Sequence, residues 1–389
     1  MEKIRLGIIG IGNMGSEHCR LILSGQTPEI ALTCVADPRQ DRRDWAQQTL
    51  PAGTGIYADG MSLIRAHACD AVLIATPHEL HPPLAEAALR AGLHVLSEKP
   101  AGVYTAQLHP VIAAAQETGR TYALMFNQRT NCVYRKAKEL IDSGALGEIK
   151  RMIWVVTDWY RTQSYYDAGA WRATWDGEGG GVLLNQCPHQ LDLLQWLCGL
   201  PVRVRAACHE GKWHDIEVED DVTAYLEFAN GATGTFIAST GDALGENRLE
   251  IIGTRARIRI ENDQLTLDTL SVDERDWCPV CKEPFGVPDV QHEIVQTDGE
   301  NPQHAGVLNA FAAHILHGTP LVADGREGIR GLMLSNAMHL SSWTNQTVSL
   351  PIDEELFLKL LNEKRRTSRR KDEVDAAIDV SGSFGSTRK

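Results

Sequence analysis

Long apolar runs are missing from this chain of 389 residues. A helix that spans a bilayer needs about 20 mostly apolar residues, so we expect no membrane partner. Basic residues are also in the minority, because 38 Lys and Arg stand against 51 Asp and Glu and leave a formal charge of -13. Nucleic-acid binding depends on clustered positive charge, so a nucleic-acid partner is disfavoured too. An apolar strand begins as early as Leu6, which predicts that no signal peptide precedes it and that the protein is cytoplasmic.

Paired cysteines are equally scarce. The nine cysteines form an odd, scattered set, which is typical of reduced thiols rather than of a disulfide framework. Only Cys278 and Cys281 have C-x-x-C spacing. A zinc site would need two more ligands, and Pro279 and Pro284 indicate a loop rather than the helix start that a redox pair uses. We therefore predict no metal site, and we disfavour redox chemistry at this pair.

A glycine-rich turn near the N-terminus is the most informative feature that is present. The apolar run Leu6-Gly7-Ile8-Ile9 leads into a G-x-G-x-x-G pattern, and an apolar helix follows. In such a turn the first glycine permits the bend, the second lets a pyrophosphate approach the backbone, and the third lets the helix pack on the strand. The pattern comprises Gly10, Ile11, Gly12, Asn13, Met14 and Gly15. We predict a dinucleotide site here, the alternative being a turn made for packing alone.

An acidic residue at the end of the next strand indicates which dinucleotide is bound. The apolar stretch 30–36 ends in Asp37, which lies about 20 residues after Gly15, as expected for the acid that binds the adenosine ribose. A carboxylate accepts hydrogen bonds from a 2′-hydroxyl and repels a 2′-phosphate, so NAD is favoured over NADP. Arg39, Arg42 and Arg43 would weaken this preference, unless they form the solvated face of the next helix, which is the interpretation we favour.

Strands and helices alternate through the first third of the chain. We expect a helix over residues 40–49, strands over 71–75, 94–96 and 122–126, and helices over 84–91 and 106–118. This alternation is typical of a parallel sheet with helices on both faces. The predicted fold class is therefore α/β, with an N-terminal Rossmann dinucleotide-binding domain at residues 1–127.

The pattern changes after residue 127. We expect a helix over 133–143, another from Gly180 or Gly181, late helices over 304–317 and 328–343, and strands over 149–157, 202–208, 221–228, 232–240, 249–253 and 257–261. Asn230-Gly231 is a strong hairpin signal, so adjacent strands should run antiparallel. Residues 128–361 are predicted to form a C-terminal α+β domain with an open, mostly antiparallel sheet and helices on one face, so the other face should pair with a second subunit in a homodimer or homotetramer. Residues 362–389 are expected to be a basic, mobile tail.

Several motifs together give a resemblance that covers almost the whole chain. They are the glycine turn, Thr76-Pro77 with His81, the triplet Glu98-Lys99-Pro100, and Gly179-Gly180-Gly181 followed by His189, Asp192 and Trp196. With them the chain resembles the glucose-fructose oxidoreductase and inositol dehydrogenase (Gfo/Idh/MocA) family. Residues 171–175 and 184–189 are similar to the branch that oxidises sugars and glycosides, including levoglucosan and C-glycoside dehydrogenases. The resemblance implies NAD as cofactor, bound by Gly10, Ile11, Gly12, Asn13, Met14, Gly15, Asp37, Thr76, Pro77, His81, Glu98 and Lys99.

The resemblance also implies catalytic roles for Lys99 and His189. Oxidation of a secondary alcohol requires a hydride acceptor, a proton acceptor and positive charge near the developing alkoxide. Lys99 would supply the charge at the carboxyl edge of the sheet, and His189 would accept the proton near neutral pH with a pKa close to its ordinary value of about 6.5. Asp192 would hold the imidazole or cap local structure. The competing interpretations are a surface ion pair of Lys99 with Glu98 and a buried, structural His189.

One position departs from the resemblance. Inositol-type members place a carboxylate four residues before the histidine, where it orients the ring, and this chain has Asn185 there. Asparagine can orient the ring or bind a sugar hydroxyl but contributes no charge. The division of labour between Lys99 and His189 therefore stays open.

Aromatic residues concentrate between Trp154 and Trp175, which hold seven of the 24 aromatics. The flat C–H faces of sugars pack on such rings, and hydroxyls seek polar partners, so we predict a sugar pocket, although some of the rings could fill the core or a subunit interface. The predicted substrate-binding residues are Lys99, Tyr165, Trp171, Arg172, Trp175, Asn185 and His189.

The function predicted from these features is that of an NAD-dependent oxidoreductase. It would transfer a hydride from a secondary ring hydroxyl of a sugar or glycoside, such as that on C3, to NAD. One alternative is a glycosidase that uses NAD transiently to oxidise C3 and eliminate the aglycone. Another is a non-catalytic regulator that binds NAD and sugar, which the presence of both Lys99 and His189 disfavours.

Overall fold

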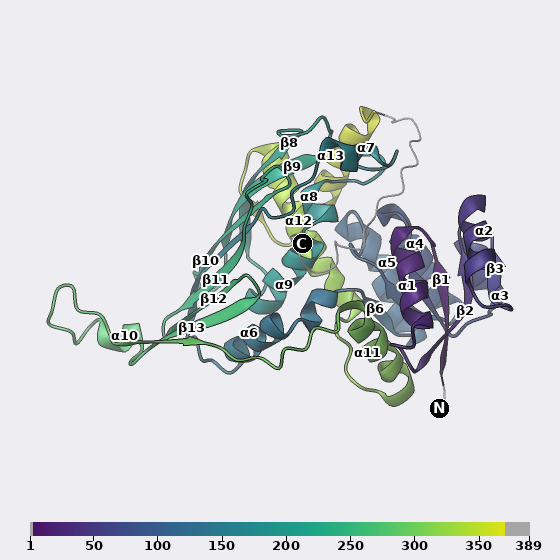
Figure 1. Cartoon of the computed structure of the whole chain (residues 1–389). Coiled ribbons are helices and arrows are strands. Elements are labelled where there is room, and N and C mark those ends of the chain that lie inside the picture. The colour runs from purple at the N-terminus through teal and green to yellow at the C-terminus, as the bar shows by residue number, and fades with distance from the viewer. Residues whose placement is uncertain (1–2, 370–389) are drawn as a thin grey trace.

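The first sheet begins with the strand that leads into the glycine-rich turn. The computed structural model describes residues 3–369, and its first six strands are all parallel, in the order β3-β2-β1-β4-β5-β6 (Figure 1). This is the strand order of Rossmann folds, so the predicted architecture of the first domain is confirmed. The strands are β1 (Ile4–Ile9), β2 (Ile30–Ala36), β3 (Gly55–Tyr57), β4 (Ala71–Ile74), β5 (His94–Ser97) and β6 (Tyr122–Leu124).

Helices cover both faces of this sheet, because successive side chains of a strand point to opposite faces. Leu6 and Ile8 of β1 pack with α1, α2 and α11, whereas Ile9 packs with α3, α4 and α5. Since α11 comes from late in the chain, the predicted range 128–361 contains a helix that completes the core of the first sheet. These helices are α1 (Asn13–Leu23), α2 (Gln40–Thr49), α3 (Gly60–Ala66), α4 (His81–Arg90), α5 (Leu108–Thr118) and α11 (Gln303–His317).

The second sheet is large and mixed, with strand order β14-β13-β12-β11-β7-β10-β9-β8-β15. Only β7 and β10 run parallel to each other, and the remaining neighbours are antiparallel. The antiparallel pairing of β9 with β10 around Asn230-Gly231 agrees with the hairpin signal. The strands are β7 (Ile149–Val156), β8 (Arg203–Glu210), β9 (Glu219–Glu227), β10 (Thr233–Ser239), β11 (Asn247–Gly253), β12 (Ala256–Glu261), β13 (Gln264–Leu270), β14 (Val290–Ile294) and β15 (Val348–Ser349).

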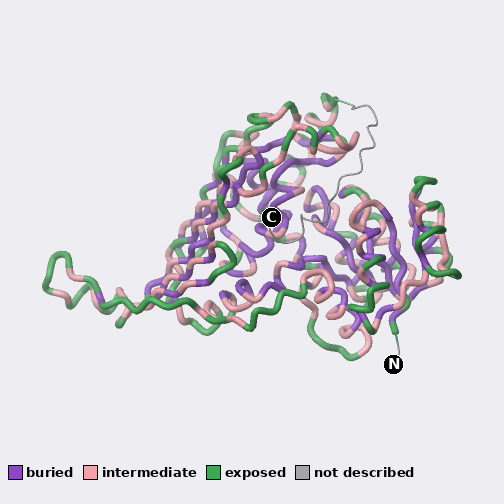
Figure 2. Tube along the Cα trace, viewed as in Figure 1, coloured by how far each residue is buried: buried purple, intermediate pink, exposed green. Residues whose placement is uncertain are grey.

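The two faces of this sheet differ in how far they are buried. In β7, Met152 and Trp154 are buried, whereas Ile153 between them is partly exposed. Tyr225 of β9, which shares the face of Ile153, is 44% exposed. Figure 2 shows that exposed residues also follow the hairpin that carries α10 (Glu274–Trp277) away from the body of the chain. The sheet is therefore covered on one face, as predicted.

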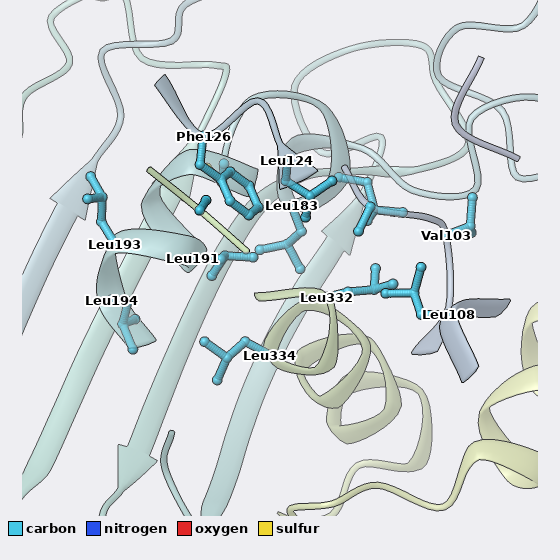
Figure 3. Close-up of a cluster of buried hydrophobic side chains, with 14 of the residues drawn as sticks. Val103, Leu108, Leu124, Phe126, Leu183, Leu191, Leu193, Leu194, Leu332 and Leu334 are labelled. Carbon is cyan, nitrogen blue, oxygen red and sulfur yellow. The ribbon is translucent and has the colours of Figure 1, made fainter. Parts of the chain in front are cut away.

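One apolar core joins the two sheets. Val103 and Leu108 from the first domain lie in the same buried cluster as Leu183 of α8, Leu191 of α9 and Leu332 of α12 (Figure 3). These three helices, together with α6, lie on the covered side of the second sheet. Their bounds are α6 (Cys132–Asp142), α8 (Val182–Asn185), α9 (Pro188–Cys198) and α12 (Gly328–Thr344).

The structure corrects several element predictions. β3, α3, β13, β14 and β15 were not expected, and neither was α13 (Glu354–Arg366). Residues 362–366 thus belong to a helix, anchored by buried Phe357 and Leu361, so the prediction of a tail from residue 362 is wrong there; the part of that tail beyond residue 369 lies outside the described residues. No helix within residues 3–369 is both long enough and apolar enough to cross a membrane.

Candidate active site

The glycine-rich turn has the shape of a pyrophosphate cradle. Gly10 has φ +88°, and a Cβ there would lie 2.6 Å from the carbonyl oxygen of Ala75. A Cβ on Gly15 would lie 1.8 Å from the carbonyl oxygen of Gly10, whereas a Cβ on Gly12 would meet nothing within 4 Å. Helix α1 begins at Asn13, and no side chain caps it. The space at Gly12 and the N–H groups of the first turn of α1 therefore suit a bound pyrophosphate.

Asp37 directly follows β2 and lies beside this turn. Its carboxylate is 7% exposed and accepts hydrogen bonds from the backbone N–H groups of Ile11 and Arg39, both at 2.9 Å. A carboxylate has about four acceptor sites, so acceptor positions are left for ribose hydroxyls. Arg39 pairs with Asp41, and Arg43 donates to the carbonyl oxygens of Asp37 and Pro38 at 2.7 Å. These contacts agree with the interpretation that the arginines form the solvated face of the helix that follows Asp37.

The turn after β4 is tied to the turn after β5 by His81. Its ring nitrogens lie 2.7 Å from the carbonyl oxygen of Thr76 and 2.8 Å from that of Pro100, and burial lowers its pKa. His81 therefore supports the two turns, and its predicted contact with the cofactor stays a prediction. The Thr76 hydroxyl, by contrast, is buried and has no hydrogen-bond partner within residues 3–369.

Glu98 also faces the protein interior. Its Oε1 lies 2.7 Å from Nε2 of His18 on α1, and its Oε2 accepts from the backbone N–H of Lys99 at 3.2 Å. Burial alone would raise its pKa, but the hydrogen bond and charge of His18, with help from His304 and Lys99, lower the pKa to about 2. Glu98 thus acts as a buried anion, and its predicted direct contact with the cofactor stays a prediction.

Lys99 points across to the second domain. Its Nζ donates to the backbone carbonyl of Asn185 at 2.9 Å, so the alternative of a surface ion pair with Glu98 is wrong. Burial lowers its pKa, and the carboxylates of Glu98 and Glu178 oppose that effect. A lysine so placed can polarise a substrate oxygen when charged, and it loses its proton more easily than a surface lysine does.

His189 lies in the first turn of α9, near Lys99. Its Nδ1 is buried and has no hydrogen-bond partner among the described residues, while the ring meets Phe126 edge-on with the ring centroids 6.2 Å apart. Burial, followed by the charge of Lys99, lowers its pKa well below the ordinary value. The direction is thus opposite to an unshifted pKa of about 6.5, and it favours the neutral imidazole.

Asp192 does not hold this imidazole. Its carboxylate makes a buried two-point contact with Arg129, with atom distances of 2.6 and 2.7 Å, and also accepts from Gln195. Arg129 in turn reaches Glu327 at 2.7 Å. This cluster links the turn that follows β6 to α9 and to the start of α12, so Asp192 stabilises the packing of these elements and not the histidine ring.

Asn185 lies at the centre of a polar network on the substrate side. Its amide nitrogen donates to the carboxylate of Glu178, and its amide oxygen accepts from the hydroxyl of Tyr165 at 3.3 Å. Arg172 donates to the same hydroxyl at 2.9 Å, and its guanidinium lies between the rings of Tyr165 and Trp171. None of the hydrogen bonds found for the Asn185 side chain reaches His189, so the expected orientation of the ring by Asn185 is not seen.

The aromatic cluster divides into two groups. Trp154 is fully buried in the core against Phe236, and Trp175 is 3% exposed and packs on His339 and Trp343. Neither ring is open to a sugar, so Trp175 is removed from the predicted substrate-binding set. Tyr165 and Trp171 are partly exposed beside Arg172 and remain in it.

Some important residues were missed in the sequence. His18 lies three positions after Gly15 and reaches Glu98, and Glu178 directly precedes the glycine triplet. Glu219 of β9 accepts from the backbone N–H groups of Gly181 and Leu183 at 2.9 and 3.0 Å, which fixes the start of α8. The available signal for His18 and Glu178 was a titratable residue that stands close to a glycine motif in the sequence.

Within the described residues, no group of three or more His, Cys, Asp or Glu side chains could hold a metal ion.

Two family models match the two halves of this arrangement. Residues 4–126 match the model described as oxidoreductase family, NAD-binding Rossmann fold, and residues 134–259 match the GFO/IDH/MocA C-terminal domain.

Curated relatives and solved structures agree with these matches. Inositol 2-dehydrogenase of Rhizobium meliloti is 22% identical over 89% of this chain and 99% of that protein, and levoglucosan dehydrogenase of Pseudarthrobacter phenanthrenivorans is 26% identical over 66% and 73%. The oxidoreductase YdgJ of Escherichia coli is 30% identical, but the chain spans only 55% of its length. The WlbA dehydrogenase of Bordetella pertussis, solved with NADH and UDP-GlcNAcA, has a TM-score of 0.75 at 26% identity, covering 90% of this chain and 100% of that one.

Proposed function

The chain belongs to the Gfo/Idh/MocA oxidoreductase family, and from that membership we propose that it is an NAD-dependent sugar or glycoside dehydrogenase. It would take a hydride from a secondary ring hydroxyl, such as that on C3. The observation that carries the proposal is the convergence of Lys99, His189 and Asn185 at the carboxyl edge of the first sheet, beside the glycine cradle. The names of two relatives, an inositol and a levoglucosan dehydrogenase, support a polyhydroxylated ring as substrate.

The residues divide the work of the reaction as follows. NAD, when bound, supplies the hydride acceptor. His189 takes the hydroxyl proton, because burial keeps its ring neutral at working pH. Lys99 places positive charge beside the oxygen from which that proton leaves. Asn185, Tyr165 and Arg172 offer hydrogen bonds to the other ring hydroxyls.

Incubation of the purified chain with NAD and a panel of sugars and glycosides tests this function. A dehydrogenase accumulates NADH, which absorbs near-ultraviolet light, in proportion to the oxidised sugar. A glycosidase that uses NAD transiently would release the aglycone without net NADH, and a regulator would bind both ligands without turnover. Absence of NADH with every sugar that binds would contradict the proposal.

We also propose that the uncovered face of the second sheet pairs with another copy of the chain. Ile153, Val155 and Ile237 are only partly buried there, and Tyr225 is 44% exposed. Such apolar side chains are usually covered in a stable protein. Light scattering should report a dimer or tetramer, and Tyr225→Glu should lower the mass. A wild-type monomer at micromolar concentration would contradict this part of the proposal.

A further inference from the structure

A buried carboxylate stands directly before the glycine triplet. Glu178 is 2% exposed, and its Oε2 accepts from the backbone N–H of Ala173 at 2.6 Å. Its Oε1 accepts from the amide of Asn185. A buried carboxylate needs such partners, because an unpaired one would be strongly destabilising.

The same contacts lead from Glu178 to Lys99 in two steps. Asn185 donates its side-chain amide to Glu178, and its backbone carbonyl accepts from Nζ of Lys99 at 2.9 Å. Glu178 also acts on Lys99 through space, because its charge opposes the effect of burial on the lysine. Glu178 thus contacts Asn185, which binds Lys99, and it also contributes to the electrostatic field at the Lys99 ammonium.

We infer that Glu178 is a positioning residue, which holds Asn185 and supplies beside Lys99 the negative charge that position 185 lacks. The inference rests on the proposed function for its kinetic part. The Asn185 side chain carries no charge of its own, and the carboxylate that reaches its amide lies seven residues earlier in the chain.

Other charged groups surround Glu178 and Lys99, and their protonation states must stay constant during a test. Glu178 faces Arg172, Glu219 and Tyr166 as well as Lys99. Burial raises the pKa of Glu178, and Arg172 opposes that effect. The groups that act on Lys99 or feel its charge are Glu98, Glu178, Arg172, Cys187, His78, His81, His189 and His304. The measurement is therefore made on the alkaline side, where carboxyl groups are ionised and histidines are neutral.

Competitive acetylation of the cofactor-free chain measures the pKa of Lys99 directly. The protein is labelled with acetic anhydride across a pH series, and mass spectrometry reports the modified fraction of Lys99, with exposed Lys282 as the internal reference. Glu178→Gln keeps the size of the side chain but removes its charge, so the apparent pKa of Lys99 should fall by about one unit. Its amide has only one oxygen, so either the hydrogen bond from Ala173 or the one from Asn185 is lost. Asp176→Asn, which removes an exposed carboxylate from the same loop, should leave it unchanged.

The kinetic arm uses a sugar that the wild-type chain oxidises. Glu178→Gln should lower kcat by about tenfold through misplacement of Asn185 and Lys99, and it should move the alkaline limb of the pH profile down by the same shift that labelling reports. An unchanged Lys99 pKa in Glu178→Gln would overturn the inference even if activity fell, because the role would then be structural only.

Two further outcomes complete the test. A fall in the Lys99 pKa, with no NADH from any sugar, would support the inference while contradicting the proposed function. If Glu178→Gln does not fold, Glu178→Asp takes its place, because it withdraws the charge from Lys99 by one methylene group. The pKa of Lys99 should then fall by a smaller amount, and no fall would overturn the inference.

Discussion

The cofactor end and the chemistry end of this site are built in different ways. At the cofactor end, Gly10, Gly12 and Gly15 shape the backbone within one turn, and function depends on where side chains are absent. At the chemistry end, Lys99 meets Asn185 across 86 residues of sequence, and side chains do the work. A site made by local backbone can be found from a short pattern, whereas a site made by distant side chains depends on the whole fold.

The largest effect is expected from a change at the chemistry end alone. Lys99→Ala should lower kcat by about 10² to 10³-fold, the usual cost of removing a group that stabilises the developing oxyanion. The dissociation constant of NAD, measured by calorimetry, should change little, because the glycine cradle is untouched. Lys282→Ala, on the exposed hairpin, serves as the control. Near-normal turnover in Lys99→Ala would remove the lysine from the mechanism.

The contact between Glu98 and His18 joins the chemistry end to the cofactor end, because Glu98 precedes Lys99 and His18 belongs to α1. A change at Glu98 therefore tests whether the two ends are independent. Glu98 has a pKa of about 2 in the folded chain, below the ordinary value of 4.5. A lowered carboxyl pKa stabilises the fold above the unfolded pKa, and this contribution is lost as the pH falls from about 4.5 to 2. The shift corresponds to about 3 kcal/mol.

Glu98→Gln should remove this part of the pH dependence. The free energy of unfolding, measured by urea titration from pH 2 to 6, should then fall less steeply with acid than in the wild type. Glu363→Gln, which changes an exposed carboxylate, should leave the slope intact. Equal slopes in Glu98→Gln and the wild type would show that the buried pair does not contribute.

A smaller effect is expected at the cofactor end, where substitutions of Gly12 and Gly15 should have different consequences. Gly12→Ala places a methyl group in the open space of the cradle, so NAD affinity should fall by about tenfold, or 1.4 kcal/mol, while the Tm of the cofactor-free chain stays constant. Gly15→Ala forces α1 away from the carbonyl of Gly10, so it should lower the Tm as well. Equal effects of the two changes on Tm would contradict the separate roles.

The smallest effect concerns the choice between NAD and NADP. Asp37→Asn keeps the shape of the side chain but removes the charge that repels a 2′-phosphate, so the ratio of the two dissociation constants should move towards NADP by about fivefold to tenfold. Asp44→Asn, which removes an exposed carboxylate from α2 that accepts from Gln40, should not move it. A wild-type chain that binds NADP as tightly as NAD would show that the arginines after Asp37 dominate.

The sequence predicted features made by local backbone better than features made by residues far apart in the chain. The turn from β1 to α1 was predicted to within a few residues, because glycine, apolar runs and helix starts are local signals. The partners of Asp192 and Glu98 were not predicted, because Arg129 and His18 lie 63 and 80 residues away. β14 was missed since all its residues are exposed and show no alternation. In α13, the basic composition hid the apolar pair Phe357 and Leu361.

The position of α11 has a consequence for how the protein is made. Val307 and Phe311 of α11 pack in the same core as Leu6 and Ile8 of β1, yet almost the entire second domain is synthesised between them. At about 5 to 20 residues per second, a ribosome needs roughly ten to forty seconds to travel from β6 to α11. During that interval the nascent first domain lacks the cover that α11 later gives to this part of its core.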